Sequence, residues 1–229
     1  MKNDISIGEI VAKDYRAAAI FKEAGIDFCC GGKQSIDEVF SEKGINRTEL
    51  ISKLEELGST PNTTTHNFIE WDPGFLCDYI VNTHHKYVMK SLPELVTYTE
   101  KIASVHGERH PELAEVADLF SQINRELLQH MKKEEDVLFP SIKEALKTGS
   151  AKAKAAIVSE ITRLSGEHEF AGAAMDKINV ITANYKVPSD GCNTYQVTFK
   201  LLSQFEDDLH THVHLENNIL FPKAISLSN

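Results

Sequence analysis

The sequence predicts an all-α protein, in which a small helical domain precedes an up-down four-helix bundle. From residue 74 onward, four long segments carry apolar residues at the three- and four-residue spacing of amphipathic helices. Strand-like alternation is nearly absent, and "TYQVTF" at residues 194–199 is its only weak candidate. Short connections between four such helices favour an antiparallel bundle.

Residues 1–57 are expected to form the small helical domain. "EIVAKDYRAAAIFKEAG" has helical spacing and ends at Gly25, which is suited to a helix C-cap. "SIDEVFSEKG" and "NRTELISKLEELG" predict two further short helices, the first beginning near Ser35. Residues 58–73 are rich in Ser, Thr, Pro and Asn, and we expect them to form a linker.

Residues 74–229 are expected to form the bundle. The first helix begins near Phe75 and meets Pro93, where it must kink or restart. The other three helices are predicted over about 112–147, 152–184 and 194–225.

Composition limits the classes of function. The chain has 229 residues, and its 41% hydrophobic content is sufficient for a sizeable core. The net charge of −10 argues against nucleic acid as a partner, because phosphate binding needs basic patches. No run of 18 apolar residues occurs, and the N-terminal residues lack the pattern of a signal peptide, so we expect neither a membrane span nor export. The adjacent pair Cys29–Cys30 is no disulfide framework, which favours a reducing, cytoplasmic location.

Each predicted bundle helix places a histidine on its apolar stripe. These histidines are His85, His130, His168 and His212, and in two helices a glutamate follows one turn later, Glu134 and Glu216. The two His–Glu pairs lie in a repeated phrase, "HMKKEEDVLFP" and "HVHLENNILFP". The stripes run as Val81, His85, Val88, Leu92; Val116, Phe120, Ile123, Leu127, His130, Glu134, Val137; Ile157, Ile161, Leu164, His168, Ala171, Met175, Ile178; and Val197, Leu201, Phe205, Leu209, His212, Glu216, Ile219.

A metal centre explains this convergence better than coincidence. A single histidine on an apolar face is usually a core residue that has found a partner. Buried carboxylates, however, need a positive partner, and no Lys or Arg shares these stripes. So many imidazoles with two carboxylates exceed one tetrahedral zinc and suit two octahedral ions bridged by glutamate. Iron fits this donor set, and residue type alone leaves zinc and manganese open. Neither Glu-x-x-His nor His-Glu-x-x-His occurs, so a ferritin-like site and a zinc-protease site are unsupported.

Several stretches together resemble a known family. They are "FCCGG", "HHKYVMKSLPEL", "SVHGERHP", "HMKKEEDVLFP", "GEHEFAG" and "HVHLENNILFP". The C-terminal part resembles hemerythrin-like domains, and nearly the whole chain is similar to the repair-of-iron-centres proteins, which repair iron–sulfur clusters. The resemblance implies a hemerythrin-like bundle with two non-haem iron ions, oxo- or hydroxo-bridged when oxidised, held by five histidines and two bridging glutamates. Carried over by position, the ligands are His85, His106, His130, Glu134, His168, His212 and Glu216.

His106 is the one ligand in this set that helical phase does not select. On a straight helix it would lie about 31 Å from His85, so it joins the site only if the chain folds back. His110 is its neighbouring rival, and geometry from sequence leaves the choice open. Of the remaining histidines, His84 is interpreted as lying outside the ligand set, and His66, His210 and His214 as surface residues.

Cys29 and Cys30 are expected in a turn before a helix. The pair could be a tight turn with one buried thiol, or it could be reactive because it lies near a helix N-terminus. The resemblance favours a redox or partner-contact role for both thiols. Cys77 and Cys192 are interpreted as structural.

The leading functional hypothesis is repair of iron–sulfur clusters damaged by nitrosative or oxidative stress, through iron donation, NO handling or both. It follows from the resemblance, whereas the spacing predicts only the metal site. Damaged iron–sulfur proteins and the small ligands NO or O₂ would then be the partners of a monomer or homodimer. The alternatives are a hemerythrin-like O₂ or NO binding or sensing module, and an enzyme that reduces NO at the two irons.

Overall fold

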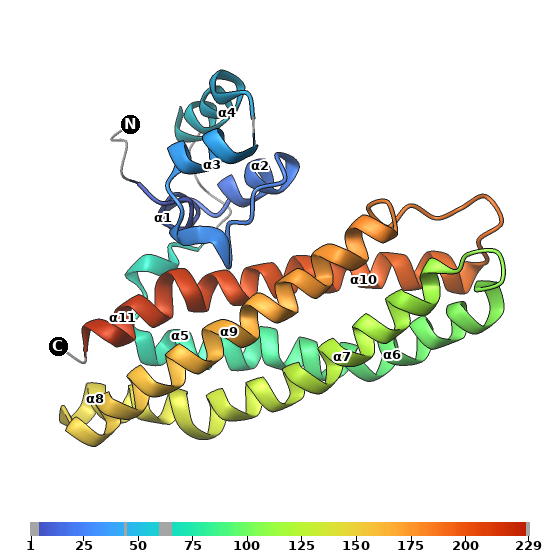
Figure 1. The fold of residues 1–229 in the computed structure, drawn as a ribbon. Coiled ribbons are helices and arrows are strands. Elements are labelled where there is room, and N and C mark those ends of the chain that lie inside the picture. The colour runs from blue at the N-terminus through green and yellow to red at the C-terminus, as the bar shows by residue number, and fades with distance from the viewer. Residues whose placement is uncertain (1–4, 44, 60–65, 228–229) are drawn as a thin grey trace.

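The computed structural model describes residues 5–43, 45–59 and 66–227, and within them the fold is all-α (Figure 1). The N-terminal unit comprises α1 (Ile7–Lys13), α2 (Ala17–Glu23), the short 3-10 helix η1 (Gly31–Lys33), α3 (Ile36–Lys43) and α4 (Arg47–Ser59). Much of the predicted linker, residues 60–65, lies outside the described residues. A further 3-10 turn, η2 (Phe68–Glu70), leads into the bundle.

The single helix that was expected to end at Gly25 is divided into α1 and α2 in the structure. It is broken at Asp14, because the Asp14 carboxylate accepts from the backbone N–H and the guanidinium of Arg16. The second piece ends before Gly25, which adopts the left-handed φ of +66°. At the next predicted start, Ser35 and Glu38 form a reciprocal capping box ahead of α3.

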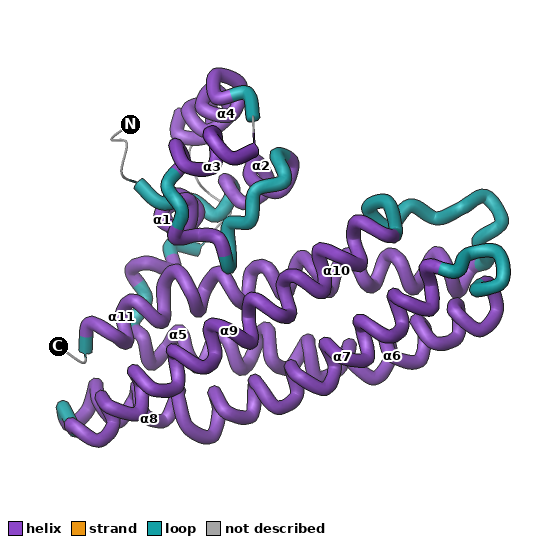
Figure 2. The backbone as a smooth tube through the Cα atoms, in the orientation of Figure 1, coloured by secondary structure: helices purple, strands orange, loops and turns teal. Residues whose placement is uncertain are grey.

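Four long helical segments form an elongated bundle beneath this unit (Figures 1 and 2). They are α5 (Pro73–Ile80) continuing through η3 (Val81–His85) into α6 (Lys86–His106); α7 (Glu112–Lys133) continuing through η4 (Glu134–Leu138) into α8 (Phe139–Thr148); α9 (Ala151–Ile181); and α10 (Asn193–Leu215) continuing through η5 (Glu216–Leu220) into α11 (Phe221–Ser226). The segments η3, η4 and η5 are single π-helical turns. In space α6 packs on α7 and α10, and α9 packs on α7, α8 and α10.

One local expectation for the bundle is narrowed and another fails. Of the kink or restart predicted at Pro93, the restart does not occur, since α6 runs unbroken from Lys86 to His106 with Pro93 inside it. The strand candidate at 194–199 lies inside α10, where Tyr195 and Phe199 are both buried.

The predicted apolar stripes form the core along most of their length. All seven positions named for α9 are buried, from Ile157 to Ile178. Val137 is 39% exposed, because the π turn η4 adds a residue and rotates the following positions off the stripe. Val197, near the free end of α10, is 44% exposed.

The N-terminal unit docks on the bundle through polar contacts and close backbone approach. Tyr15 Oη lies 2.6 Å from Thr211 Oγ1, and Lys22 Nζ lies 2.9 Å from the buried Glu206. Asn218, in η5, donates from Nδ2 to the carbonyl of Cys29 at 3.0 Å. A Cβ added at Gly32 would stand 2.4 Å from Asn218 Oδ1, so a larger residue here would have to displace the Asn218 side chain.

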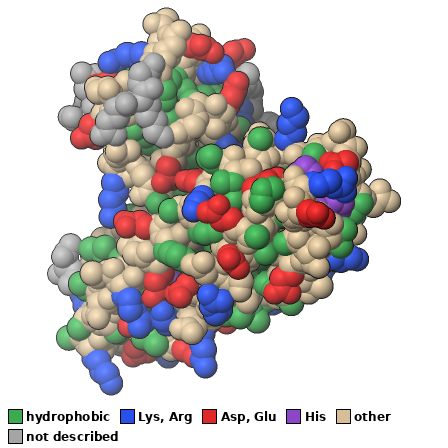
Figure 3. Space-filling model, turned by 45° about the vertical axis from the view of Figure 1, so that its right-hand side comes forward, with side chains coloured by type: hydrophobic (Ala, Val, Ile, Leu, Met, Phe, Trp, Pro, Cys, Tyr) green, Lys and Arg blue, Asp and Glu red, His purple; other side chains and the backbone are tan. Residues whose placement is uncertain are grey.

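The surface carries interspersed charge. Acidic and basic side chains alternate over the face shown in Figure 3. No helix among the described residues is long and apolar enough to cross a membrane.

Candidate metal centre

Six of the seven predicted ligands meet in the interior of the bundle. Their donor atoms form two groups, and within each group all atoms lie within 4.8 Å of one another. One group is His85, Glu134, His212 and Glu216, and the other is His130, Glu134, His168 and Glu216. Both glutamates belong to both groups, and all six residues are buried.

Each glutamate lies between a histidine of one group and a histidine of the other. Glu134 Oε2 is 3.3 Å from Nε2 of both His85 and His130. Glu216 Oε1 is 3.1 Å from His212 Nε2, and its Oε2 is 3.1 Å from His168 Nε2. This is the arrangement in which two carboxylates can bridge two cations.

The π turns place these side chains. His85 ends η3, whereas Glu134 and Glu216 begin η4 and η5. Single π turns inside α-helices occur often at functional sites, because the extra residue re-aims the side chains around it. The repeated phrase therefore carries its glutamate at the start of a π turn, and the Phe–Pro that follows opens the next helix instead of ending the segment.

The phenylalanines of the repeated phrase pack against two histidines of the site. Phe139 stacks on His85, with ring centroids 5.7 Å apart and planes at 21°. Phe221 stacks on His168 at the same 5.7 Å, with planes at 8°. Each copy of the phrase thus supplies a glutamate and an aromatic ring, and the ring packs on a histidine from a different helix.

Three of the four histidines are fixed through Nδ1 by an acceptor. His85 Nδ1 lies 2.7 Å from Glu135 Oε1, and His130 Nδ1 lies 2.9 Å from Glu167 Oε2. His168 Nδ1 lies 2.9 Å from the amide oxygen of Asn217, the assigned acceptor atom. Because these oxygens accept, Nδ1 carries the proton and donates, which leaves the Nε2 lone pair directed into the cluster.

The unpaired atoms of the cluster fit bound cations. Both oxygens of Glu134, Oε2 of Glu216 and Nε2 of His85 are buried without a hydrogen-bond partner among the described residues. His130 Nε2 and His168 Nε2 face each other at 2.9 Å, although Nδ1 holds the proton of each neutral ring. A cation between such atoms would satisfy all of them, whereas protein groups do not.

The electrostatics also show concentrated negative charge. Burial disfavours charged His130, but Glu134 outweighs it and raises the pKa of His130 to about 10. The hydrogen bond from His130, assisted by Lys133, lowers the pKa of Glu167 to about 2. Without a metal the cluster would have to hold protons on buried imidazoles to balance its carboxylates.

His106 does not lie at this cluster, which corrects its assignment as a metal ligand from the family resemblance. Helix α6 continues without a break from Lys86 to His106, so His106 lies about 30 Å along the helix from His85. There its Nε2 lies 3.2 Å from Cys192 Sγ. The rival His110 lies at the same end, 3.0 Å from Asp190, and does not join the cluster either.

Of the remaining histidines, two lie where they were expected and two are more buried than expected. His84 lies outside both groups, as expected, and its Nδ1 lies 2.9 Å from Asp208. His66 is exposed. His214 is fully buried, because the N-terminal unit covers it with Phe28 and Tyr15. His210 is half-buried at the same interface.

The cysteines are placed in three environments. Cys77 is buried, as expected of a structural thiol, whereas Cys192 is exposed. Cys29 and Cys30 lie in a turn whose backbone N–H groups donate to Asp27, with their sulfurs 3.9 Å apart. Cys30 Sγ is 3.5 Å from the backbone carbonyl oxygen of His168.

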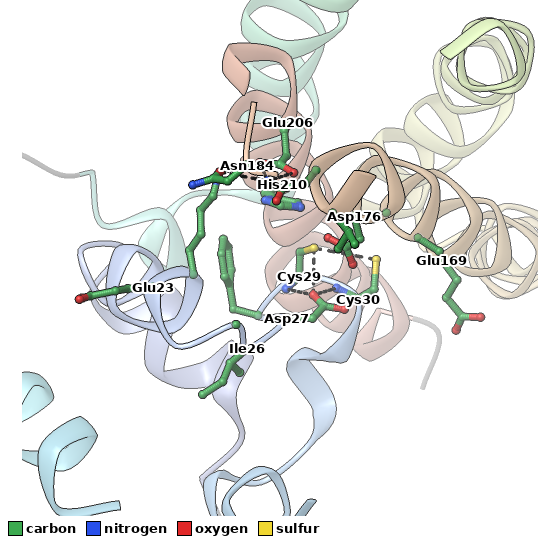
Figure 4. Close-up of a pocket in the computed structure, with 17 residues that line it drawn as sticks. Glu23, Ile26, Asp27, Cys29, Cys30, Glu169, Asp176, Asn184, Glu206 and His210 are labelled. Carbon is green, nitrogen blue, oxygen red and sulfur yellow. Dashed lines mark hydrogen bonds and ion pairs between the residues drawn. The ribbon is translucent and has the colours of Figure 1, made fainter. Parts of the chain in front are cut away.

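A cavity of about 830 Å³ lies between the N-terminal unit and helices α9 and α10. Figure 4 shows Cys29, Cys30, Asp176 and His210 around it, with Glu206 on its bundle side. The cysteine turn therefore lies at a cavity that borders the helix carrying His168.

Sequence reasoning missed the side chains that fix the histidines. Glu135, Glu167 and Asn217 each directly adjoin a cluster residue: Glu134, His168 and Glu216, respectively. That adjacency was visible in the sequence, since such a neighbour turns toward the next helix of the bundle.

Comparisons with known proteins identify relatives along the whole chain. The family model described as the hemerythrin HHE cation-binding domain matches residues 78–224, and one described as a domain of unknown function (DUF542) matches residues 3–58. The iron–sulfur cluster repair protein YtfE of Pectobacterium carotovorum is 34% identical over 225 residues, which cover 97% of each chain. The corresponding protein of Musicola paradisiaca is 34% identical over 96% of each chain. The iron–sulfur cluster repair protein ScdA of Staphylococcus epidermidis is 32% identical over 97% of this chain and 98% of its own.

Proposed function

Because the chain belongs to the family of iron–sulfur cluster repair proteins with a hemerythrin-like cation-binding domain, we propose that it binds two iron ions and repairs damaged iron–sulfur clusters. The observation that carries the proposal is the sharing of Glu134 and Glu216 by two buried donor groups. Damaged iron–sulfur proteins would be its clients, and NO or O₂ its small ligands.

In this proposal each iron has two histidines of its own and shares both glutamates. His85 and His212 would hold one ion, and His130 and His168 would hold the other. Imidazole and carboxylate together suit iron, and the names of the relatives favour iron over other metals with similar preferences. When bound, the pair would supply two adjacent ions able to leave for a damaged cluster or to take a small diatomic ligand.

The chain's own residues orient the donors and exclude water. Glu135, Glu167 and Asn217 hold three imidazoles with Nε2 facing inward. Phe139 and Phe221 cover the rings of His85 and His168. The glutamates are fully buried, so in a partly dry site their charge is weakly screened and would favour two cations bound close together.

We assign the N-terminal unit, residues 1–57, the contact with partners or reductants. Cys30 touches the helix of His168, and Asn218 clamps the carbonyl of Cys29, so the cysteine turn is held beside the site. The hydrogen bond between the two thiols, followed by burial, raises the pKa of Cys29 well above its usual range. Cys30 is half-buried and lines the cavity, which makes it the sulfur that a partner would meet first.

Repair can be tested with a purified [4Fe–4S] dehydratase inactivated by NO. We expect the iron-loaded protein to restore its activity anaerobically, and the iron-depleted protein to fail. Equal recovery with both forms would contradict a repair role for the bound iron. Repeated NO addition with gas analysis then separates a binding module from an NO reductase, since only the latter forms N₂O over several turnovers.

A further inference from the structure

A cysteine–histidine pair lies at the far end of the bundle from the cluster of metal-binding candidates. Cys192 is exposed at the N-terminus of α10, the 23-residue helix, and its Sγ lies 3.2 Å from His106 Nε2. About 30 Å of α6 separates His106 from His85, so this pair does not belong to the metal centre.

The histidine of this pair is buried, and only one of its two ring nitrogens has a polar partner among the described residues. His106 is only 5% exposed, and its Nδ1 has no hydrogen-bond partner among the described residues. The His106 and Tyr195 rings pack in a T-shaped arrangement, with centroids 5.3 Å apart. The Cys192 thiol is therefore the polar group at which this imidazole is aimed, and His106 Nε2 can accept the proton that leaves the sulfur.

The surroundings favour an ionised sulfur. The backbone N–H groups of the first turn of α10, with that of Tyr195 foremost, and then the imidazole of His106 lower the pKa of Cys192 to about 7. The charged groups around it are largely paired with one another: Arg109 and His110 both contact Asp190, and His110 also contacts Glu112. In Figure 3 this end of the bundle shows histidine, basic and acidic side chains together.

We infer that Cys192 and His106 form a thiol–disulfide exchange site, at which Cys192 takes a reversible mixed disulfide from low-molecular-weight disulfides. The Cys192 sulfur attacks one sulfur of R–S–S–R, a new S–S bond forms, and the original S–S bond breaks. The leaving thiolate takes the proton that Cys192 gave to His106. The small disulfide is thereby reduced to one thiol, and Cys192 is oxidised to the mixed disulfide.

Two of the other cysteines are less suited to this reaction. Burial raises the pKa of Cys77, and contact with Cys30 together with burial raises that of Cys29. A thiol attacks disulfides best when its pKa lies near the ambient pH, which is the condition that Cys192 meets. The inference rests on this pair alone and is independent of the proposed iron chemistry.

The test uses the full-length protein and oxidised glutathione, with peptide mapping to locate the adduct. We expect one adduct, on Cys192, with a rate that rises through an inflection near pH 7. His106→Gln removes the proton acceptor and should slow the reaction at pH 6.5 on the order of tenfold. His110→Gln, four residues away and not in contact with the thiol, is the matched control and should leave the rate within about twofold.

Three outcomes would overturn the inference. One is an adduct that forms on Cys30 as fast as on Cys192. Another is equal slowing by the two histidine variants, with helicity unchanged in both. The third is a disulfide-linked dimer through Cys192 in place of the adduct. If His106→Gln fails to fold, the pH profile of the unaltered chain decides, because an inflection near the ordinary thiol value of about 8.5 would contradict a paired sulfur.

Discussion

Two adjacent asparagines in the π turn η5 are predicted to have separable roles. Asn217 accepts from His168 Nδ1 at 2.9 Å, whereas Asn218 donates to the carbonyls of Cys29 and Phe28 at 3.0 and 3.3 Å. The same substitution at either position removes the same side chain from the same turn. Asn217→Ala should therefore act on metal binding, and Asn218→Ala on the docking of the N-terminal unit.

The magnitude for Asn217→Ala follows from the loss of one ring anchor. Without the amide oxygen, the His168 imidazole loses the acceptor that fixes its tautomer and orientation. Loss of such a contact lowers metal affinity roughly 10–100-fold, or about 1.4–2.7 kcal/mol. Asn217→Asp restores an acceptor and should recover most of the affinity.

Asn218→Ala is the matched control. It removes donors to two backbone carbonyls, which should destabilise the docked N-terminal unit by about 1–3 kcal/mol. Iron affinity should stay within about threefold, because His168 keeps its anchor. Anaerobic competition for Fe(II) against a chelator measures the first quantity, and thermal unfolding measures the second. If the two variants lose iron equally, or if Asn217→Ala keeps full affinity, Asn217 does not position a ligand.

Three further predictions test the site and the division between domains. Glu134→Leu should reduce the iron content and the magnetic coupling more than His168→Leu does, because loss of a bridging carboxylate leaves two cations that repel each other. Equal losses in the two variants would mean that Glu134 is an ordinary ligand or a core residue. Replacing both Cys29 and Cys30 with Ser should leave iron content intact while impairing cluster repair in cells, and unimpaired repair would make the pair structural. A chain lacking residues 1–59 should keep its iron, since every proposed ligand follows that segment; loss of both ions on truncation would refute the separation of roles.

Helical phase was sufficient to find the cluster. His85, His130, His168 and His212 were predicted from apolar spacing alone, and the structure brings them together. This works because a long amphipathic helix has one buried stripe, and residues on the stripes of four packed helices must meet. His106 came from the resemblance and against its distance from His85 along a straight helix, and the structure agrees with that distance, because α6 runs unbroken to His106.

The predictions from sequence fail where a residue's burial or contacts depend on a shift in helical register or on a distant segment of the chain. Val137 is exposed because a π turn shifts the helical register, and no spacing rule announces such a turn. His214 is off the bundle stripe but buried, because the N-terminal unit covers a second face of α10. Cys192 acquires its partner from a helix that ends 86 residues earlier in the chain.

The most direct test of the central claim is a Mössbauer spectrum of the purified, oxidised protein, recorded with its iron content. Two donor groups sharing Glu134 and Glu216 predict two irons per chain whose spins are strongly coupled through the bridges. One iron per chain, or two irons with uncoupled spins, would contradict the shared-carboxylate centre.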